Sequence, residues 1–321
     1  MKKGNIKKTK NSNFKFGNTL FGKIWHHKNG KIGIIVLTIV ILITIFAFCL
    51  TPYDPYAYDI TKALQKPSTE HWLGTDQNGV DILTQILYGG RLSLLIGIAT
   101  GLGCTFFGAL LGIVAGYFGK VASSIILNSI NVLMVIPTLP LMIVMHKVSS
   151  SYLMMIFIFI MFGWSGIARL VRSQVLNIRN MEYIKQAELN GASKFYIMRR
   201  HILPGIANLL IMNTALSCAG FMIAEAGLSF MGLGDPSKIS WGKMLVAAQE
   251  YAYSNSLWLW IIAPGIALVI VVVGFMNIGY ALEEICNPRS KKVKDNFKMM
   301  SKLTQKQIEE AFKEDDENEN I

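Results

Sequence analysis

Residues 92–116 read LSLLIGIATGLGCTFFGALLGIVAG, an unbroken run without a charged side chain. A helix needs about 20 mainly apolar residues to cross the hydrocarbon core of a bilayer, because its backbone polar groups must be satisfied within the segment. This run is long enough to cross. The whole chain has a similar character, since 52% of its residues are hydrophobic, 16% are charged and the mean hydropathy is +0.41. The sequence therefore predicts a protein that lies largely in lipid.

Five further stretches share this apolar character and complete a set of six expected membrane-spanning helices. The six cover residues 32–50, 92–116, 125–144, 152–170, 206–224 and 257–278. The expected fold class is therefore an all-α polytopic membrane protein with six transmembrane helices. The other segments give its organisation: an arm over 1–31, a loop over 51–88, a five-helix core over 89–282 that contains a long loop at 171–204, and a tail over 283–321.

The distribution of lysine and arginine predicts the orientation in the membrane. The formal net charge is +11, and the cations concentrate in the arm, the 171–204 loop and the tail, whereas the 51–88 loop is acidic overall. Loops rich in lysine and arginine stay in the cytoplasm, so we expect both termini and the 171–204 loop there, with 51–88 and 229–256 outside the plasma membrane. Cations spread in this way predict contact with membrane lipid and no nucleic-acid partner.

Residues 17–24 read GNTLFGKI and come close to a phosphate-binding P-loop. That motif needs a hydroxyl residue after its lysine to hold magnesium, and a buried strand before its first glycine. Here Ile24 follows Lys23, and a segment rich in lysine and asparagine precedes Gly17. We therefore expect no ATP site and no enzymatic activity in this chain. If ATP drives the protein, a separate subunit binds it.

The groups that could carry metal, redox or proton chemistry are scattered along the chain. The four cysteines lack paired spacing and the five histidines lie in tails, loops or helix ends: Cys49, Cys104, Cys218, Cys286, His26, His27, His71, His146 and His201. The main ionisable residue within an expected span is Glu225, at the outer end of the fifth helix, where a capping or interfacial role is expected. We therefore expect no metal site, no cofactor in this chain and no ion-coupled carrier, which would need buried carboxylates.

Glycines recur along one face of the second expected helix. They are Gly97, Gly101, Gly108, Gly112 and Gly116. Small residues at this spacing let another helix approach closely and pack backbone against backbone. The spacing does not say whether that helix belongs to this chain or to another one.

Residues 182–204 read EYIKQAELNGASKFYIMRRHILP and predict two short helices around a bend, over 183–189 and 194–201. Gly191 suits the left-handed conformation that ends a helix, and Ser193 can cap the next one through its hydroxyl. Pro204 lies where a new helix can start, because its missing N–H costs nothing in the first turn. A short, partly apolar helix held outside the membrane suits insertion into a groove on a soluble partner, although an ordinary connecting loop is the alternative.

This loop resembles the coupling region of binding-protein-dependent ABC permeases. The residues that match that family's pattern are Tyr183, Ala187, Gly191, Ala192, Ser193, Arg199, Arg200, His201, Ile202, Leu203 and Pro204, whereas Lys185 and Gln186 stand where the family usually has Glu and Ala. Further segments are similar to the second permease of the oligopeptide, dipeptide and nickel branch: HWLGTDQNGVDIL at 71–83, YGGRLSL at 88–94, GYFG at 116–119, ARLVR at 168–172, AEAGLSFMGLG at 224–234 and NPR at 287–289. Val80 replaces a usual arginine in the first of these.

The resemblance implies the fold of a type I importer permease and a set of partners. The chain would form half of a heterodimer with a homologous second permease, above two cytoplasmic ATPase subunits that bind ATP and magnesium and below an extracytoplasmic binding protein. The residues expected to contact the ATPase are Tyr183, Lys185, Gln186, Ala187, Gly191, Ala192, Ser193, Leu203 and Pro204. The resemblance assigns no substrate-binding residue.

Three hypotheses for function remain open at the level of the sequence. The first is a permease for oligopeptides or dipeptides, and the second is a permease for nickel or a metal chelate. The sixteen methionines do not favour metal, because methionine is a common apolar filler in membrane helices. The third, from another class, is a membrane anchor or receptor whose basic arm binds anionic lipid.

Overall fold

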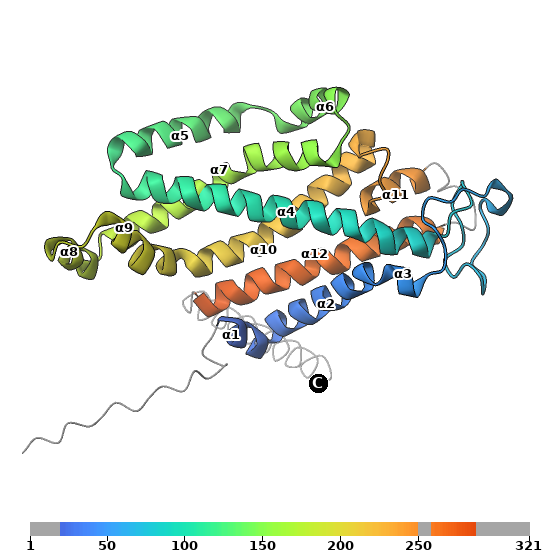
Figure 1. Cartoon of the computed structure of the whole chain (residues 1–321), viewed down its shortest axis with the longest axis horizontal. Coiled ribbons are helices and arrows are strands. Elements are labelled where there is room, and N and C mark those ends of the chain that lie inside the picture. The colour runs from blue at the N-terminus through green and yellow to red at the C-terminus, as the bar shows by residue number, and fades with distance from the viewer. Residues whose placement is uncertain (1–19, 250–257, 287–321) are drawn as a thin grey trace, which may run out of the picture.

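The regular structure of the chain is helical throughout the part described by the computed structural model, which comprises residues 20–249 and 258–286 (Figure 1). An isolated bridge between Thr75 and Asp81 is the strand-type pairing found within those ranges. The all-α fold class expected from the sequence is confirmed. The arm up to residue 19 and the tail from 287 lie outside the described residues, as does the segment 250–257 of an expected outer loop.

Five helices are long and apolar enough to cross a membrane. They are α2 (Lys28–Ile45), α4 (Ile82–Tyr117), α7 (Tyr152–Arg179), the helical segment Lys194–Leu233, which contains α10 (Leu203–Leu228), and α12 (Trp258–Cys286). A sixth crossing is reached if α5 (Lys120–Val135) and α6 (Thr138–Val148) count as one broken span. Short elements complete the chain: α1 (Leu20–His26), α3 (Ala47–Leu50), η2 (Ile60–Lys62), α8 (Glu182–Leu189), α9 (Lys194–Ile197), η3 (Met198–Ile202), η4 (Ser229–Leu233) and α11 (Trp241–Gln249).

The third expected span, 125–144, differs from the prediction because it is broken in two. Helices α5 and α6 meet at an angle of 79°. Between them Ile136 has an extended backbone, with φ −73° and ψ 120°, and Pro137 follows. A residue before proline is pushed out of the helical region, and proline itself cannot donate the backbone hydrogen bond that would continue the helix. The expectation of a single span over residues 125–144 rested on their apolar content and did not take account of Pro137.

Two other boundaries also move relative to the expected organisation. Helix α4 begins at Ile82, inside the expected 51–88 loop, because Asp81 caps it: the Asp81 carboxylate accepts a hydrogen bond of 2.8 Å from the backbone N–H of Thr84. Helix α7 runs on to Arg179, inside the expected 171–204 loop. Its last turns bury Val171, Val175 and Ile178 against the bundle, and this packing extends the helix beyond its apolar run.

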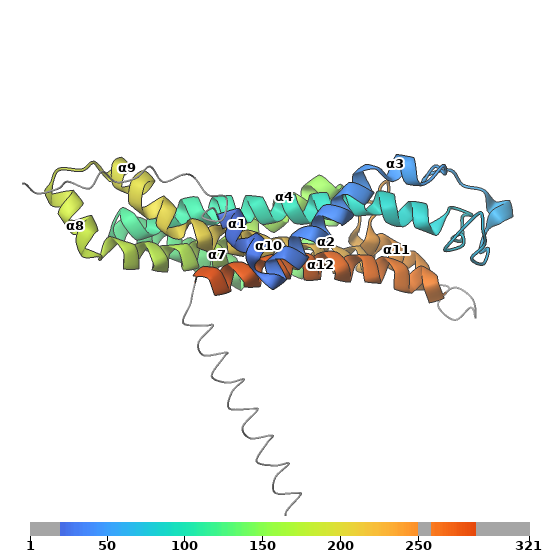
Figure 2. The ribbon, with the colours of Figure 1, turned by 90° about the horizontal axis from the view of Figure 1, so that it is seen from below.

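The long helices run side by side along the length of the molecule and form a flattened bundle (Figures 1 and 2). Helix α4 lies between α7 and α10, while α12 packs between α10 and α2. One end of the bundle, here called the loop end, carries residues 51–81 and α11. The opposite end, here called the α8 end, carries α8 and α9.

The glycine face of α4 packs against two helices of the same chain. Gly97 and Gly101 face Met222 and Cys218 of α10, whereas Gly108, Gly112 and Gly116 face α7. A Cβ atom added at Gly112 would lie 2.7 Å from both the Ala168 carbonyl oxygen and the Val171 Cβ. The backbones of α4 and α7 can therefore approach closely only because no side chain separates them.

We expect Gly112→Ala to destabilise the helix bundle by about 1–3 kcal/mol, because the added methyl group would overpack a contact made against backbone atoms of α7. Gly166 of α7 provides the control, since a Cβ there meets no atom within 4 Å. The measurement is the thermal unfolding midpoint of the detergent-solubilised protein. Equal midpoints for Gly112→Ala and Gly166→Ala would contradict the close-packing assignment.

Candidate functional site

The surface at the α8 end combines buried anchors with exposed apolar side chains. Ile184 of α8 and Ile197 of α9 are fully buried in a cluster with Val175, Ile178 and Ile206 of the long helices. In contrast, Leu189 is 87% exposed and Phe195 is 68% exposed, and both Tyr183 and Tyr196 are about half exposed. Isoleucines on the inner face therefore fix the two short helices, while their outer face presents large apolar groups to whatever lies beyond the bundle.

A Schellman motif holds the bend between α8 and α9. Gly191 has a φ of +81°, and its N–H donates to the Glu188 carbonyl at 3.0 Å. The N–H of Ala192 donates to the Ala187 carbonyl at 3.0 Å, which completes the pair of bonds that defines the motif. Ser193 then caps α9, since its hydroxyl accepts the Tyr196 N–H at 3.3 Å. The angle between the two helices is thus set by backbone geometry.

The remaining residues expected in this loop lie on the same surface. Lys185, Gln186, Leu203 and Pro204 are exposed, and Ala187 and Ala192 are half-buried. The His201 ring lies between the rings of Tyr183 and Tyr196, at centroid distances of 5.8 and 6.0 Å. These aromatic contacts join α8 to the start of the long helix, and the sequence reasoning did not anticipate them.

Pro204 lies in the first turn of α10, as expected, but α10 continues directly from a helical segment before it. The chain is helical from Lys194 up to a kink at Gly232, where φ is +81°, and a π-turn over Met198–Ile202 precedes the proline. Within a regular α-helix the proline ring would clash with the carbonyl four residues earlier and leave it without a donor. The wider π-turn, in which the Leu203 N–H bonds to the Met198 carbonyl, accommodates the proline without ending the helix.

A second tie between α8 and the bundle comes from α4. The Tyr117 hydroxyl donates to the Glu188 carboxylate at 3.5 Å, and the Arg179 guanidinium lies 5.4 Å from the centre of the Tyr117 ring. Tyr117 is the last residue of α4. The only hint of this contact in the sequence is a tyrosine after the last helix glycine.

Comparison with known proteins shows which family this chain matches. Residues 108–292 match the family described as binding-protein-dependent transport system inner membrane component. Residues 21–67 match the N-terminal TM domain of oligopeptide transport permease C. The chain belongs to the family of binding-protein-dependent permeases.

Curated relatives match most of this permease. The dipeptide transport system permease protein DppC of Alkalihalophilus pseudofirmus is 34% identical over 84% of this chain and 89% of its own length. A putative peptide transport system permease of Brucella abortus is 32% identical over 84% of this chain and 90% of its own length. The oligopeptide transport system permease protein OppC of Mycobacterium tuberculosis is 31% identical over 80% of this chain and 90% of its own length.

Family membership confirms the expected location in the membrane and the expected role as a permease subunit. The chain is a multi-pass inner membrane protein and the permease subunit of a binding-protein-dependent ABC importer, not its ATPase. Partners that hydrolyse ATP and that bind substrate are implied. Part of the sequence resembling a P-loop, residues 17–19, lies outside the described residues. The described remainder is helical, and Ile24 is buried against the residues near Gly30.

At the loop end, the segment 71–83 folds onto the start of α4. His71 hydrogen-bonds through Nδ1 to the Asp81 carboxylate at 3.0 Å, and both side chains are buried. The other Asp81 oxygen accepts the hydroxyl of Thr84, whose oxygen lies 2.5 Å from that of Thr51. Asp76 accepts the side-chain amide of Gln85 at 2.6 Å. These acidic residues therefore act as acceptors that fix the loop.

Glu225 has a different environment from the capping or interfacial one expected. Its side chain is only 1% exposed, and its carboxylate accepts hydrogen bonds from Ser229 at 2.8 Å and from Ser93 of α4 at 3.2 Å. The Ser93 oxygen in turn accepts the backbone N–H of Trp241, the first residue of α11, at 3.2 Å. One buried carboxylate thus connects α10, η4, α4 and α11.

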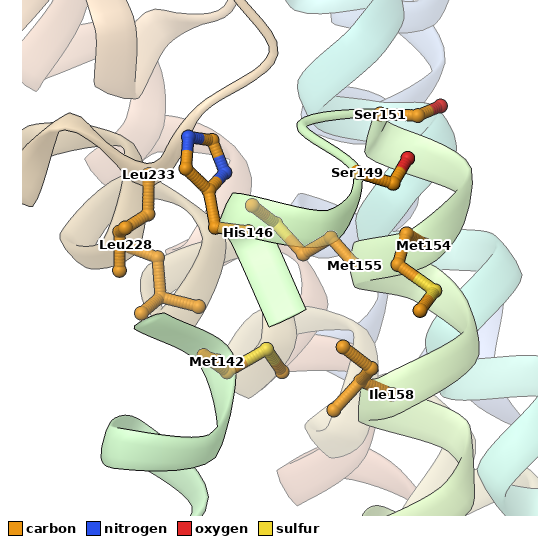
Figure 3. Close-up of a pocket in the computed structure, with 9 residues that line it drawn as sticks. All are labelled: Met142, His146, Ser149, Ser151, Met154, Met155, Ile158, Leu228 and Leu233. Atoms are coloured by element: carbon orange, nitrogen blue, oxygen red, sulfur yellow. The ribbon is translucent and has the colours of Figure 1, made fainter. Parts of the chain in front are cut away.

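An apolar groove opens between α6, α7 and α10. It spans about 1010 Å³, open solvent included. Aromatic rings and methionines line it, including Met142, Phe159, Phe162, Phe221 and Met231. A smaller, narrow hollow adjoins it and is lined by residues that include His146 and three methionines (Figure 3). Sequence reasoning missed this gathering because its members come from two different helices.

The described residues that line this hollow do not form a cluster of metal ligands. Figure 3 shows the His146 ring beside Leu233 on one side of the hollow and Met154 at α7 on the other. Across residues 20–249 and 258–286 there is no group of three or more His, Cys, Asp or Glu side chains that could hold a metal ion. The absence of a metal from the whole chain stays a prediction.

Proposed function

We propose that this permease is one half of a heterodimer that imports oligopeptides or dipeptides and that couples to separate ATPase subunits through α8 and its bend. The observation that carries the coupling role is the combination at the α8 end of buried isoleucine anchors with an exposed outer face. A helix that is fixed from within and apolar on the outside suits a groove on a soluble partner. ATP and magnesium would be bound by those partners.

The long helix Lys194–Leu233 supports a mechanical route from this contact to the loop end. Residues 194–231 precede a kink at Gly232 and extend about 57 Å at 1.5 Å per residue. The helix begins directly after the bend at Gly191 and ends next to the buried Glu225 junction. A displacement of α8 when the ATPase pair closes would therefore move the helix that lines the apolar groove.

Peptide is the substrate we favour. The curated relatives named above are peptide, oligopeptide or dipeptide permeases. The wall that this chain contributes to the groove is apolar and aromatic, which suits varied side chains better than a hydrated metal ion. Nickel or a metal chelate was the alternative from the sequence, and the lining offers it no oxygen or nitrogen cluster. The anchor or receptor hypothesis is replaced by membership of a permease family.

Uptake in cells that lack this gene tests the substrate. We expect such cells to lose uptake of radiolabelled dipeptides and short oligopeptides, to regain it with the wild-type chain, and to keep nickel uptake unchanged. A loss of nickel uptake with normal peptide uptake would reverse the assignment.

The orientation that follows from the basic loops is a further part of this proposal: the α8 end would be cytoplasmic and the loop end extracytoplasmic. In a background without the native cysteines, Ser68→Cys and Gln186→Cys place exposed thiols at the two ends. We expect an impermeant maleimide to label intact cells only at residue 68, and at residue 186 only after lysis. Labelling of residue 186 in intact cells would show the opposite orientation.

A further inference from the structure

A cavity at the loop end carries positive charge without a carboxylate to balance it. It is an open hollow of about 750 Å³, solvent space included, between the start of α4, the start of α7 and the segment before α11. Two cations, three phenols and an apolar floor line it, among them Tyr56, Tyr88, Arg91, Leu95, Tyr152 and Lys238. No Asp or Glu lines the cavity among the residues that the structure describes.

The two cations are not neutralised by neighbouring groups. Arg91 donates from Nε to the Thr44 carbonyl at 2.8 Å and from Nη2 to the Ile45 carbonyl at 3.0 Å, and its guanidinium lies 4.4 Å from the centre of the Tyr88 ring. Carbonyls and an aromatic face orient the guanidinium but leave its full charge. Lys238 is exposed and forms no ion pair within the described part of the chain.

The nearest acidic side chain is already engaged elsewhere. Asp235 accepts the Tyr152 N–H at 3.2 Å and both the N–H and the hydroxyl of Ser237, at 2.9 and 2.6 Å. The pKa of Asp235 is lowered: burial alone would raise it, but the Ser237 and Tyr152 hydrogen bonds and the positive charge of Lys243 outweigh that effect. Its two oxygens are therefore engaged by Tyr152 and Ser237, and Asp235 is not among the residues that line the cavity.

The position of Arg91 puts this cavity at the edge of the hydrocarbon layer. Arg91 is the last charged residue before the uncharged run 92–116. Helix α4 has 36 residues and is about 54 Å long, which exceeds a hydrocarbon core of about 30 Å. Because Arg91 ends the uncharged run, we infer that the turns before it project beyond the core and that Arg91 and the surrounding tyrosines lie at headgroup level.

An exposed apolar stripe leads from the cavity along α4 toward the membrane centre. Leu95, Leu102, Phe106 and Leu110 are each about half exposed or more, and their spacing of seven, four and four residues places them on one helical face. An anionic group in the cavity would thus have an apolar track directly below it. A cationic pocket above an apolar track fits a molecule with a charged head and a long acyl chain.

We propose that this cavity binds the headgroup of an anionic membrane phospholipid, with the phosphate between Arg91 and Lys238 and an acyl chain along the α4 stripe. The three tyrosines supply hydroxyl groups for the phosphate and glycerol oxygens, and their rings suit the membrane interface. Occupation of the site would connect α4, α7 and the segment before α11 through a single lipid.

The test uses the assembled importer complex in nanodiscs of phosphatidylglycerol mixed with phosphatidylcholine, and counts retained lipids by native mass spectrometry. We expect the complex to retain phosphatidylglycerol in preference to phosphatidylcholine. Lys238→Gln should weaken that retention about fivefold, because a cation near the surface contributes about a factor of five in lipid binding. Lys66→Gln removes an equal charge from the same loop end, outside the cavity, and should leave retention unchanged.

Three outcomes would overturn the proposal. The first is equal retention of the two lipids by the wild-type complex. The second is displacement of phosphatidylglycerol by inorganic phosphate at millimolar concentration, which would show a site for the free anion without an acyl-chain contribution. The third is retention by the isolated chain but not by the complex, which would show that the sister permease covers this face. None of these results bears on the peptide uptake proposed above, so the two proposals fail independently.

Discussion

If α8 couples to the ATPase as proposed, Gly191→Val is expected to reduce uptake by about tenfold to a hundredfold while the protein still inserts into the membrane. Gly191 has a φ of +81°, a conformation that costs an ordinary side chain about 1–2 kcal/mol and a β-branched one more. A Cβ atom there would meet no atom within 4 Å, so the cost comes from the backbone and not from a clash. Relief of this strain would change the angle between α8 and α9 and turn the exposed face away from the ATPase.

The measurement combines uptake with co-purification of the ATPase subunits. Gly191→Asn is the matched control, because asparagine adopts the left-handed conformation more readily than other residues. It should keep most of the transport activity. Wild-type uptake by Gly191→Val at normal expression would contradict the coupling role of this bend.

Glu225→Ala is expected to lower the stability of the complex by about 2–5 kcal/mol. The substitution leaves a cavity and removes the acceptor of two buried hydroxyls, those of Ser93 and Ser229, and each buried polar group without a partner costs about 1–3 kcal/mol. Because Ser93 also holds the first N–H of α11, the loss should spread to the loop end. Thermal unfolding of the detergent-solubilised complex measures the effect.

Glu225→Gln provides the comparison, since an amide keeps the volume and can still accept one serine hydroxyl. We expect it to be clearly milder than Glu225→Ala. If the two variants unfold at the wild-type temperature, the buried network contributes nothing measurable and its role as a junction is wrong. If only transport falls in Glu225→Gln, the network acts on movement and not on stability.

Most of the membrane-crossing helices could be predicted because their signal is local. A run such as 92–116 excludes charge over the thickness of a bilayer, and little except a helix can satisfy its backbone there. The bend at Gly191 was predictable for the same reason, since glycine followed by a capping serine is a local signal. The matching family and the fold class followed from these segments.

The features that were missed depend on contacts between distant parts of the chain. Glu225 is buried because Ser93, 132 positions away in sequence, supplies a hydroxyl to it. The helix ends before Pro137, whereas at Pro204 the preceding π-turn lets the helix continue. The packing around each proline decides between these two results. The sequence pattern around either proline does not contain that packing.

The π-turn at Met198–Ile202 makes the length of this segment as important as its composition. Each residue of an α-helix turns the chain by about 100°. A deletion or insertion of one residue between α9 and α10 would therefore rotate α8 about the long helix axis by roughly that angle. Every side chain on the exposed outer face of α8 would be unchanged but would point in a different direction. Variation among descendants of this gene should accordingly consist here of exchanges of one amino acid for another, with the number of codons held constant.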